Sequence, residues 1–145
     1  MVTLIGMGSG KWEALSAQAQ QAVRSAGLVF GAKRLLAGLP ADCTARQFAL
    51  YQPADILETP AQTPGQDAAV LYSGDTGFYS GAFGLLTPLR ALGIPARGYP
   101  GVSSIQLLSA ALGRPWQDWK LVSAHGCACD PVAECMMNRS VFFLT

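Results

Sequence analysis

The sequence is poor in charge and in cysteine, and each shortage excludes a class of protein. Only 13% of the 145 residues are charged, and ten basic against nine acidic side chains give a formal net charge of +1. A surface that binds phosphate backbones needs a basic excess, so nucleic acid is disfavoured as a partner. The four cysteines are too few and too unevenly spaced for a disulfide framework, and we therefore expect reduced thiols.

Long apolar runs and a basic leader are also missing. No run approaches the ~20 apolar residues that a membrane-spanning helix needs, and residues 1–6 have neither a basic start nor a long apolar core. These absences predict a soluble, cytoplasmic protein with no membrane partner. Half of the residues are hydrophobic, and the length suits one ordinary domain or one domain plus part of another.

What the sequence does contain is one pattern that occurs three times. An apolar segment ends in a loop that contains glycine, and a segment with helical spacing of apolar residues follows. The expected strands are residues 2–5, 68–72 and 94–99, and the expected helices are residues 12–26, 81–92 and 104–113. Such alternation predicts an α/β fold with a parallel sheet and right-handed crossovers, which places all three loops on one rim.

The remaining segments continue the alternation. Between the first and second repeats we expect a strand at 28–31, a short helix at 32–39, a strand within 44–50 and a helical turn at 54–58. After a linker at 114–118 we expect a strand at 120–125, a helix at 130–138 and a strand at 140–144. A hydrophobic strand so near the last residue would leave an exposed edge, so we expect a truncated chain or a covering second chain, as in a homodimer.

The first glycine loop, Gly6-Met7-Gly8-Ser9-Gly10, is a candidate for ligand contact. Glycines let backbone amides approach a ligand, and the following helix presents its positive end. The dinucleotide fingerprint fails because Lys11 stands where the third glycine belongs, and the phosphate-binding P-loop fails at Ile5 and Trp12. A tight strand-to-helix turn and a ligand-binding turn both stay open.

The middle loop, residues 73–80, carries one carboxylate at the carboxyl end of a buried strand. Ligands in open α/β sheets bind beyond such strand ends. Asp75 can serve simply as an acceptor for backbone N–H groups of its own loop. The small residues around it, together with Phe78 and Tyr79 as apolar walls, equally suit a flat and partly polar small molecule.

His125 is the only histidine, and it lies close to Cys127, Cys129 and Cys135. The spacing is poor for structural zinc, because Cys-x-Cys is tight and Cys135 falls in an expected helix. A catalytic cysteine–histidine pair would need a tertiary convergence that the sequence does not reveal. We therefore expect ordinary free thiols and no metal site.

Taken together, the three loops resemble those of the tetrapyrrole (corrin/porphyrin) methylases, which use S-adenosylmethionine. The resemblance is carried by Gly6-x-Gly8-Ser9-Gly10, Ser73-Gly74-Asp75-Thr76-Gly77-Phe78-Tyr79-Ser80 and Pro100-Gly101-Val102-Ser103-Ser104. Within that family, Pro115-Trp116-Gln117-Asp118 and Val122-Ser123-Ala124-His125-Gly126 are most similar to the cobalamin-biosynthesis branch that methylates C5 of precorrin-7 or cobalt-precorrin-7. Some relatives there are fused to a decarboxylating methyltransferase.

The resemblance implies two α/β domains with the cofactor between them, an N-terminal domain over residues 1–115 and the truncated beginning of a second over 116–145. It implies a methyltransferase that acts on a precorrin with S-adenosylmethionine as cofactor and with a decarboxylating partner. Apart from the resemblance, we expect Tyr79 and His125 to face the tetrapyrrole, and no residue is assigned a catalytic role. The implied cofactor contacts are Ser9, Ser73, Gly74, Asp75, Phe78, Ser103 and Ser104.

Two positions depart from the family pattern. Thr76 stands where many relatives have proline, and Cys127 stands where a basic residue is expected after His-Gly. A methylase for another tetrapyrrole carbon and a non-catalytic binding module are the alternatives. Methylation of ribosomal RNA is disfavoured by the lack of a basic surface.

Overall fold

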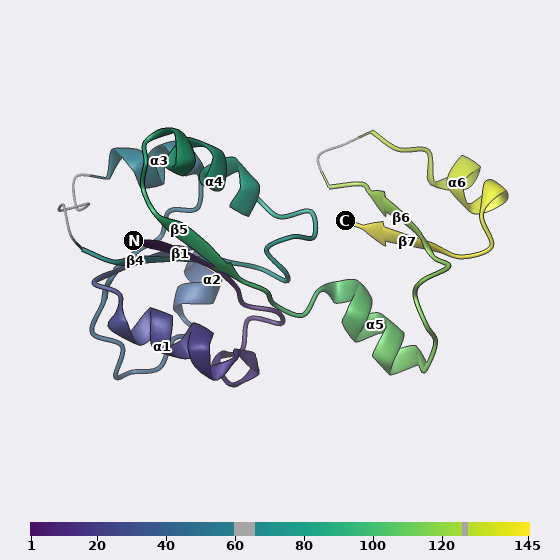
Figure 1. The fold of residues 1–145 in the computed structure, drawn as a ribbon. Helices are drawn as coiled ribbons and strands as arrows, with labels where there is room; N and C mark the ends of the chain where they lie inside the picture. Colours follow the sequence, from purple (N-terminus) through teal and green to yellow (C-terminus); the bar gives the residue numbers. More distant parts are fainter. Residues whose placement is uncertain (60–65, 126–127) are drawn as a thin grey trace. The chain divides into compact units, whose positions relative to one another are not determined.

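A computed structural model describes residues 1–59, 66–125 and 128–145. These residues form two compact units, Met1–Ser103 and Ser104–Thr145, whose helices and strands are labelled in Figure 1. The departure from the family pattern at Cys127 lies outside the described residues.

The first unit is built on a five-stranded parallel sheet with the strand order β3-β2-β4-β1-β5. The predicted α/β fold class is therefore confirmed. Every neighbouring pair runs parallel because a crossover connection separates the strands in sequence. The strands are β1 (Val2–Gly6), β2 (Leu28–Gly31), β3 (Arg46–Phe48), β4 (Ala68–Tyr72) and β5 (Ala96–Tyr99).

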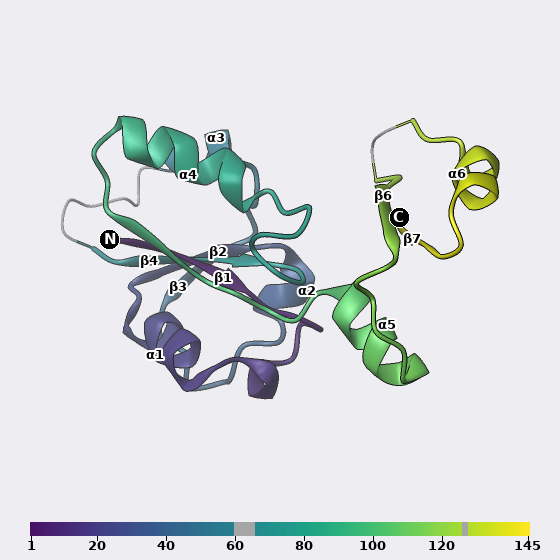
Figure 2. The ribbon, with the colours of Figure 1, turned by 45° about the vertical axis from the view of Figure 1, so that its right-hand side comes forward.

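Helices cover both faces of this sheet, as Figure 2 shows. On one face α1 (Ala17–Ser25) and α2 (Lys33–Leu36) pack over residues such as Ile5 and Leu71. The opposite face is covered by α3 (Pro53–Glu58) and α4 (Ala82–Ala91), which bury the intervening strand residues. All residues of β1 and β4 are buried, which explains why neither strand alternates with polar residues.

One predicted helix is wrong in its extent. Residues 12–26 do not form one helix but a 3-10 turn, η1 (Trp12–Ala14), followed by α1. The break comes at Ser16, whose backbone is extended and whose hydroxyl accepts a hydrogen bond from the N–H of Ala19 at 3.2 Å. A serine in this position is a favoured N-cap, and it starts α1 five residues later than apolar spacing alone indicates.

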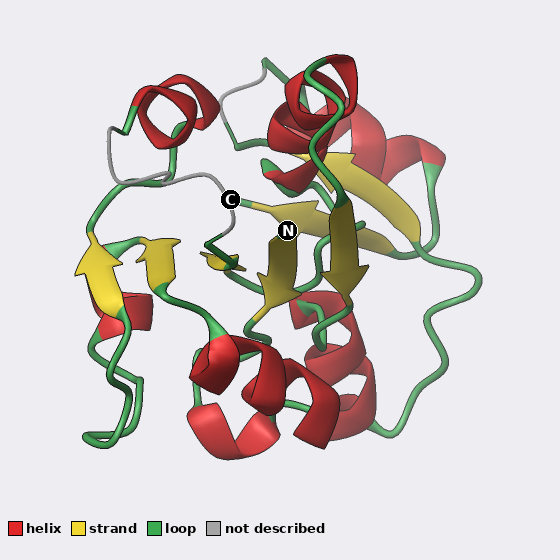
Figure 3. Cartoon of the chain, turned by 60° about the vertical axis from the view of Figure 1, so that its left-hand side comes forward, coloured by secondary structure: helices red, strands yellow, loops and turns green. Residues whose placement is uncertain are grey.

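The second unit contains a two-stranded parallel sheet and two helices (Figure 3). Asp130 caps the second helix by accepting hydrogen bonds from Val132 and Ala133 at 3.0 and 3.1 Å. The elements of this unit are α5 (Ser104–Leu112), β6 (Lys120–Ser123), α6 (Pro131–Met137) and β7 (Val141–Leu144). The two units divide after Ser103, whereas the predicted domains divide between residues 115 and 116. The two boundaries differ because the prediction assigns α5 to the first domain. The predicted boundary concerns the domains of a longer family member and stays a prediction.

Three further observations concern the described part of the chain. No helix there is both long and apolar enough to cross a membrane. Cys43, Cys129 and Cys135 are free thiols. Within the same residues, no three His, Cys, Asp or Glu side chains gather in a way that could hold a metal ion.

Candidate functional site

Three loops meet at one end of the first unit, beyond the carboxyl ends of β1, β4 and β5. These strands are adjacent in the order β4-β1-β5, so the loops that follow them are neighbours in space. The predicted gathering of the three loops on one rim is confirmed for Gly6–Gly10, 73–80 and 100–103. The rim is the position at which open parallel sheets bind ligands.

Glycines from the three loops pack backbone against backbone. A Cβ added to Gly101 would lie 2.2 Å from the carbonyl oxygen of Gly74 and 2.6 Å from that of Gly6. A Cβ on Gly6 would lie 2.5 Å from the nitrogen of Gly101. Side chains do not fit at such separations, so we call Gly6, Gly74 and Gly101 the glycine junction.

The first and second loops are also joined by a pair of hydrogen bonds. Gly8 and Gly74 each donate an N–H to the other's carbonyl at 3.0 Å, which forms an isolated antiparallel bridge. Both residues have positive φ angles, +55° and +66°, a conformation that glycine adopts without a Cβ penalty. Nothing lies within 4 Å of the missing Cβ of Gly74, so open space remains on that side of the loop.

Asp75 joins the second loop to the third. Its Oδ1 accepts the N–H of Gly101 at 3.1 Å, and its Oδ2 accepts the N–H of Gly77 at 2.9 Å. The carboxylate is thus an acceptor for loop amides, as the structural interpretation of the sequence proposed. Each oxygen keeps a second lone pair, so a ligand donor can still bind to the same half-buried side chain.

An aromatic pair follows the carboxylate in the second loop. The rings of Phe78 and Tyr79 meet edge to face with their centroids 4.9 Å apart. Tyr79 has a φ of +48° and is 54% exposed. It is the single non-glycine residue with positive φ in the described chain, and such backbone strain gathers at sites where structure serves function.

The other predicted contacts fall in different environments. Ser9 and Ser73 are exposed on the rim, whereas Ser103 is 4% exposed and buried. Ser104 is the first residue of α5 and His125 is exposed, and both belong to the second unit. The Gly8–Gly74 bridge joins the loop of Ser9 to the loop of Gly74 and Asp75, and the contact of these residues with a cofactor stays a prediction.

A tyrosine at the end of β4 is buried directly behind the rim. Tyr72 is 7% exposed, and its hydroxyl has no hydrogen-bond partner among the described residues. Burial raises the pKa of Tyr72 to about 12, because the charged phenolate would lose its solvation. The phenol therefore stays protonated at neutral pH and does not serve as a base.

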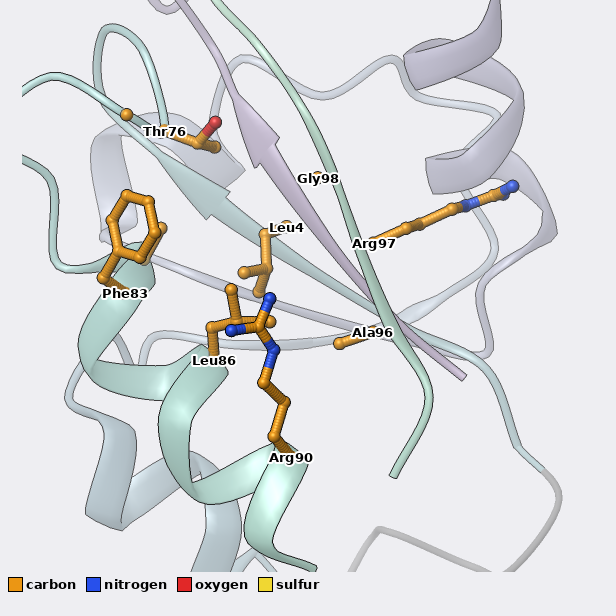
Figure 4. Close-up of a pocket in the computed structure, with 10 residues that line it drawn as sticks. Leu4, Thr76, Phe83, Leu86, Arg90, Ala96, Arg97 and Gly98 are labelled. Carbon is orange, nitrogen blue, oxygen red and sulfur yellow. The ribbon is translucent and has the colours of Figure 1, made fainter. Parts of the chain in front are cut away.

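A hollow of about 200 Å³ opens beside the second loop, within the first unit (Figure 4). It is lined by Thr76 and Gly77 of the second loop and by residues of α4 and β5. The side chain of Arg90 extends from α4 and lines this hollow. The hollow was not foreseen from the sequence.

The close packing of Gly6 against Gly101 was not predicted from the sequence. Of the three glycines in the junction, only Gly74 was expected to contact the cofactor. A signal was present, because glycine ends the apolar run of β1 and immediately follows the proline after β5. A glycine in each of these places indicates that another backbone comes close.

The chain matches the model of the Tetrapyrrole (Corrin/Porphyrin) Methylases over residues 1–140. It is 33% identical to the Cobalt-precorrin-7 C(5)-methyltransferase of Salmonella typhimurium, and the match covers 100% of this chain and 71% of that protein. It is 28% identical to the Probable cobalt-precorrin-7 C(5)-methyltransferase of Methanocaldococcus jannaschii, covering 87% of this chain and 61% of that one.

A solved structure has the same fold. It is described as the Cobalamin Biosynthesis Precorrin-6Y Methylase (cbiE) from Archaeoglobus fulgidus, with a TM-score of 0.72 and 21% identity over 99% of this chain and 72% of that one. The chain thus spans between three fifths and three quarters of the length of these proteins. The family match and the rim loops lead to one conclusion: the chain belongs to the tetrapyrrole (corrin/porphyrin) methylases.

Proposed function

We propose that this chain is part of an S-adenosylmethionine-dependent C-methyltransferase of cobalamin biosynthesis that methylates C5 of a precorrin or cobalt-precorrin. The observation that supports this function best is the glycine junction, which gathers three loops beyond adjacent strand ends. The Salmonella typhimurium and Methanocaldococcus jannaschii relatives carry the C5 specificity in their names. The proposal extends that specificity to this chain.

The rim fits the cofactor in three respects. Backbone approaches are close there, and open space lies over Gly74, so a flat nucleoside can lie against main chain. The exposed residues Ser9 and Ser73 offer hydroxyl groups for hydrogen bonds to a ligand at this rim. Asp75 holds two amides and retains acceptor capacity for a hydroxyl or amine.

S-Adenosylmethionine supplies a methyl group already activated by its sulfonium, so no residue of the chain needs to act as a nucleophile. The work of this chain is to bind and to orient. The glycine junction fixes the loops relative to one another, and Asp75 fixes the second against the third. Tyr79, on its strained and exposed turn, is proposed to face the tetrapyrrole, and His125 is proposed as a second substrate contact.

Cofactor binding is tested by titrating S-adenosylhomocysteine into the 145-residue chain in a calorimeter. The Salmonella typhimurium relative serves as a positive control, because its name states the activity proposed here. Saturable binding to both proteins supports the proposal. Binding to the relative with none to this chain would contradict the assignment of the cofactor site to these three loops.

The methylated carbon is tested separately. The chain is incubated with precorrin-7 or cobalt-precorrin-7 and a ¹³C-methyl-labelled cofactor, and the labelled position in the product is read by NMR. Label at C5 supports the specificity. Label at another carbon would support methyl transfer but contradict the assignment to C5. Cofactor binding without any methyl transfer would favour the non-catalytic alternative.

A further inference from the structure

The hollow beside the second loop has an apolar interior and a cationic end. Leu4 of β1 forms its floor, and Ala82 and Leu86 of α4 form one side. Arg90 lies one helical turn beyond Leu86, and Figure 4 shows its guanidinium reaching back along Leu86 towards Leu4. The body of a ligand in this hollow would thus contact aliphatic side chains, and one end of the ligand would contact the guanidinium of Arg90.

The size of the hollow limits what can occupy it. Its volume of about 200 Å³ exceeds the share of ~30 Å³ that one water molecule takes up. It is smaller than the ~300–1,000 Å³ typical of pockets for drug-sized ligands. The hollow therefore suits a small molecule of a few carbon atoms, or one side arm of a larger molecule.

Among the residues that the structure describes, the charge at its end has no ion-pair partner. Arg90 is exposed and takes part in neither ion pair of the described residues, which join Met1 with Asp67 and Arg24 with Asp42. Arg97 also contributes to the wall, but its guanidinium lies 5.2 Å from the ring centroid of Tyr99, and Figure 4 shows the side chain directed away from the hollow.

We propose that this hollow binds a carboxylate carried on a short aliphatic chain. The guanidinium of Arg90 would donate two parallel hydrogen bonds to the carboxylate, which is the geometry that arginine favours. The aliphatic part would displace water from Leu4 and Leu86. Thr76, which also lines the hollow, would limit the length of chain that fits.

The carboxylate can come from two sources. One is a free fatty acid of a few carbons, and the other is an arm of a tetrapyrrole carboxylic acid. The second source rests on the proposed function, because it makes the hollow a substrate subsite beside the second loop. Both sources present the same chemistry to Arg90, so the test must separate them.

Gly98 offers a way to fill the hollow without touching its charge. A Cβ at this position would approach only the carbonyl oxygen of Leu4 and Oγ1 of Thr76, both at 4.0 Å. The residue is not among those with positive φ, and it lies in the edge strand β5. Gly98→Val therefore suits the backbone, while its methyl groups would project into the space that the ligand needs.

The first experiment titrates sodium butyrate into the ¹⁵N-labelled 145-residue chain and follows the amides of Gly77 and Gly98 by NMR. Butyramide, which has the same shape without the charge, is the control ligand. We expect butyrate to shift both amides, and we expect Arg90→Gln to weaken its binding at least about tenfold. Arg97→Gln removes the same charge next to the hollow and should change the affinity less than about twofold.

Gly98→Val should abolish the butyrate shifts while its spectrum remains that of a folded protein. The proposal is overturned if butyrate leaves these amides unmoved, if butyramide binds as well as butyrate, or if Arg90→Gln and Arg97→Gln weaken binding equally. The last result would indicate general attraction to a basic surface.

The second experiment identifies the source. Mesoporphyrin, which carries two propionate arms, is added to the butyrate-bound chain, with its dimethyl ester as the control. Displacement of butyrate by the acid alone supports a substrate subsite; no displacement assigns the hollow to free carboxylates and overturns the substrate source. S-Adenosylhomocysteine titrations of the same variants should give wild-type affinity, so a failure of the proposed function stays distinguishable from a failure of this site.

Discussion

The two units of this chain use the same local pattern with different results. In the first unit, β1 and β4 are buried along their whole length, and helices cover both faces of the sheet. In the second unit, β6 and β7 are also parallel, yet Phe142 is the only strand residue described there as buried. Helix α6 buries none of its described residues.

The difference shows what a parallel sheet needs. Parallel strands are stable where helices cover both faces, and few apolar contacts mean a low free energy of local opening. The glycine junction adds close backbone packing to the first unit, whereas Gly113 of the second unit has nothing within 4 Å of its missing Cβ. We therefore expect substitutions in the first unit to be the more costly.

Gly101→Ala should have the largest effect. Its new Cβ would meet two backbone carbonyl oxygens at 2.2 and 2.6 Å, and backbone cannot move aside as a flexible side chain can. We expect the free energy of unfolding of the first unit to fall by about 3 kcal/mol or more. Urea denaturation followed by Trp12 fluorescence measures this, because Trp12 is buried in that unit.

Gly93→Ala is the matched control for that substitution. It has a φ of +68° and open space around its missing Cβ, so it should cost only the conformational penalty of about 1–2 kcal/mol. Equal costs at Gly93 and Gly101 would show that backbone conformation, and not the close packing of the junction, decides the stability of the rim.

Asp75→Ala should have the next largest effect, because it removes an acceptor shared by two loops. The amides of Gly77 and Gly101 lose their partner, and we expect a loss of about 1–3 kcal/mol in the free energy of unfolding. Calorimetry should also show weaker binding of S-adenosylhomocysteine. Asp42→Ala, which breaks an exposed ion pair with Arg24, should cost no more than about 1 kcal/mol and leave the affinity unchanged.

If Asp75→Ala binds S-adenosylhomocysteine with unchanged affinity, the carboxylate does not contact the cofactor and has a structural role only. That outcome is informative because the sequence supported both interpretations, and the structure shows the amide contacts of the first.

Much of the fold could be predicted because buried strands and helix starts leave strong local signals. The uninterrupted apolar run of β4 and the glycine-containing loops after β1, β4 and β5 sufficed to place three loops on one rim. The extent of η1 and α1 could not be predicted from apolar spacing, since Trp12 and Leu15 fit a continuous helix. The capping hydrogen bond of Ser16 overrides that spacing.

The site was predictable at the level of loops and not at the level of contacts. That Gly6 and Gly101 touch depends on the strand order β4-β1-β5, which is a tertiary property. The hollow beside Arg90 depends on how far α4 stands from β5. The hollow has no signature in the spacing of residues along the chain, and the two glycines signal a close backbone without identifying which one it is.

Tyr72 should make the stability of the first unit depend on alkaline pH. Its pKa rises from the ordinary 10 to about 12 in the folded state, so the unfolded state loses the proton first. Stability is therefore full below pH 10 and falls between pH 10 and 12, by about 2 kcal/mol or less. Tyr72→Phe should remove this part of the pH dependence in urea denaturation, and Tyr51→Phe, at a 57% exposed position, should not.

Tyr72→Phe should also leave stability at neutral pH unchanged or raise it by about 1 kcal/mol, because the buried hydroxyl has no partner among the described residues. A loss of stability on this substitution would indicate that the hydroxyl makes a hydrogen bond, for instance to an ordered water, and would account for a polar atom in the core.

The smallest expected effects come from the two N-caps, and they test the comparison between the units most directly. Ser16→Ala removes the cap of α1, which packs on the sheet, and should lower the free energy of unfolding of the first unit by about 1 kcal/mol. Asp130→Ala removes two capping hydrogen bonds from α6. Since α6 buries no described residue, its loss should speed amide hydrogen exchange within residues 131–137 and leave exchange in β1 and β4 unchanged. Slower exchange in α6 than in β4 in the unsubstituted chain would show that the contrast in burial does not set the stability of the two units. A loss of protection in β4 on Asp130→Ala would show that the two units unfold as one.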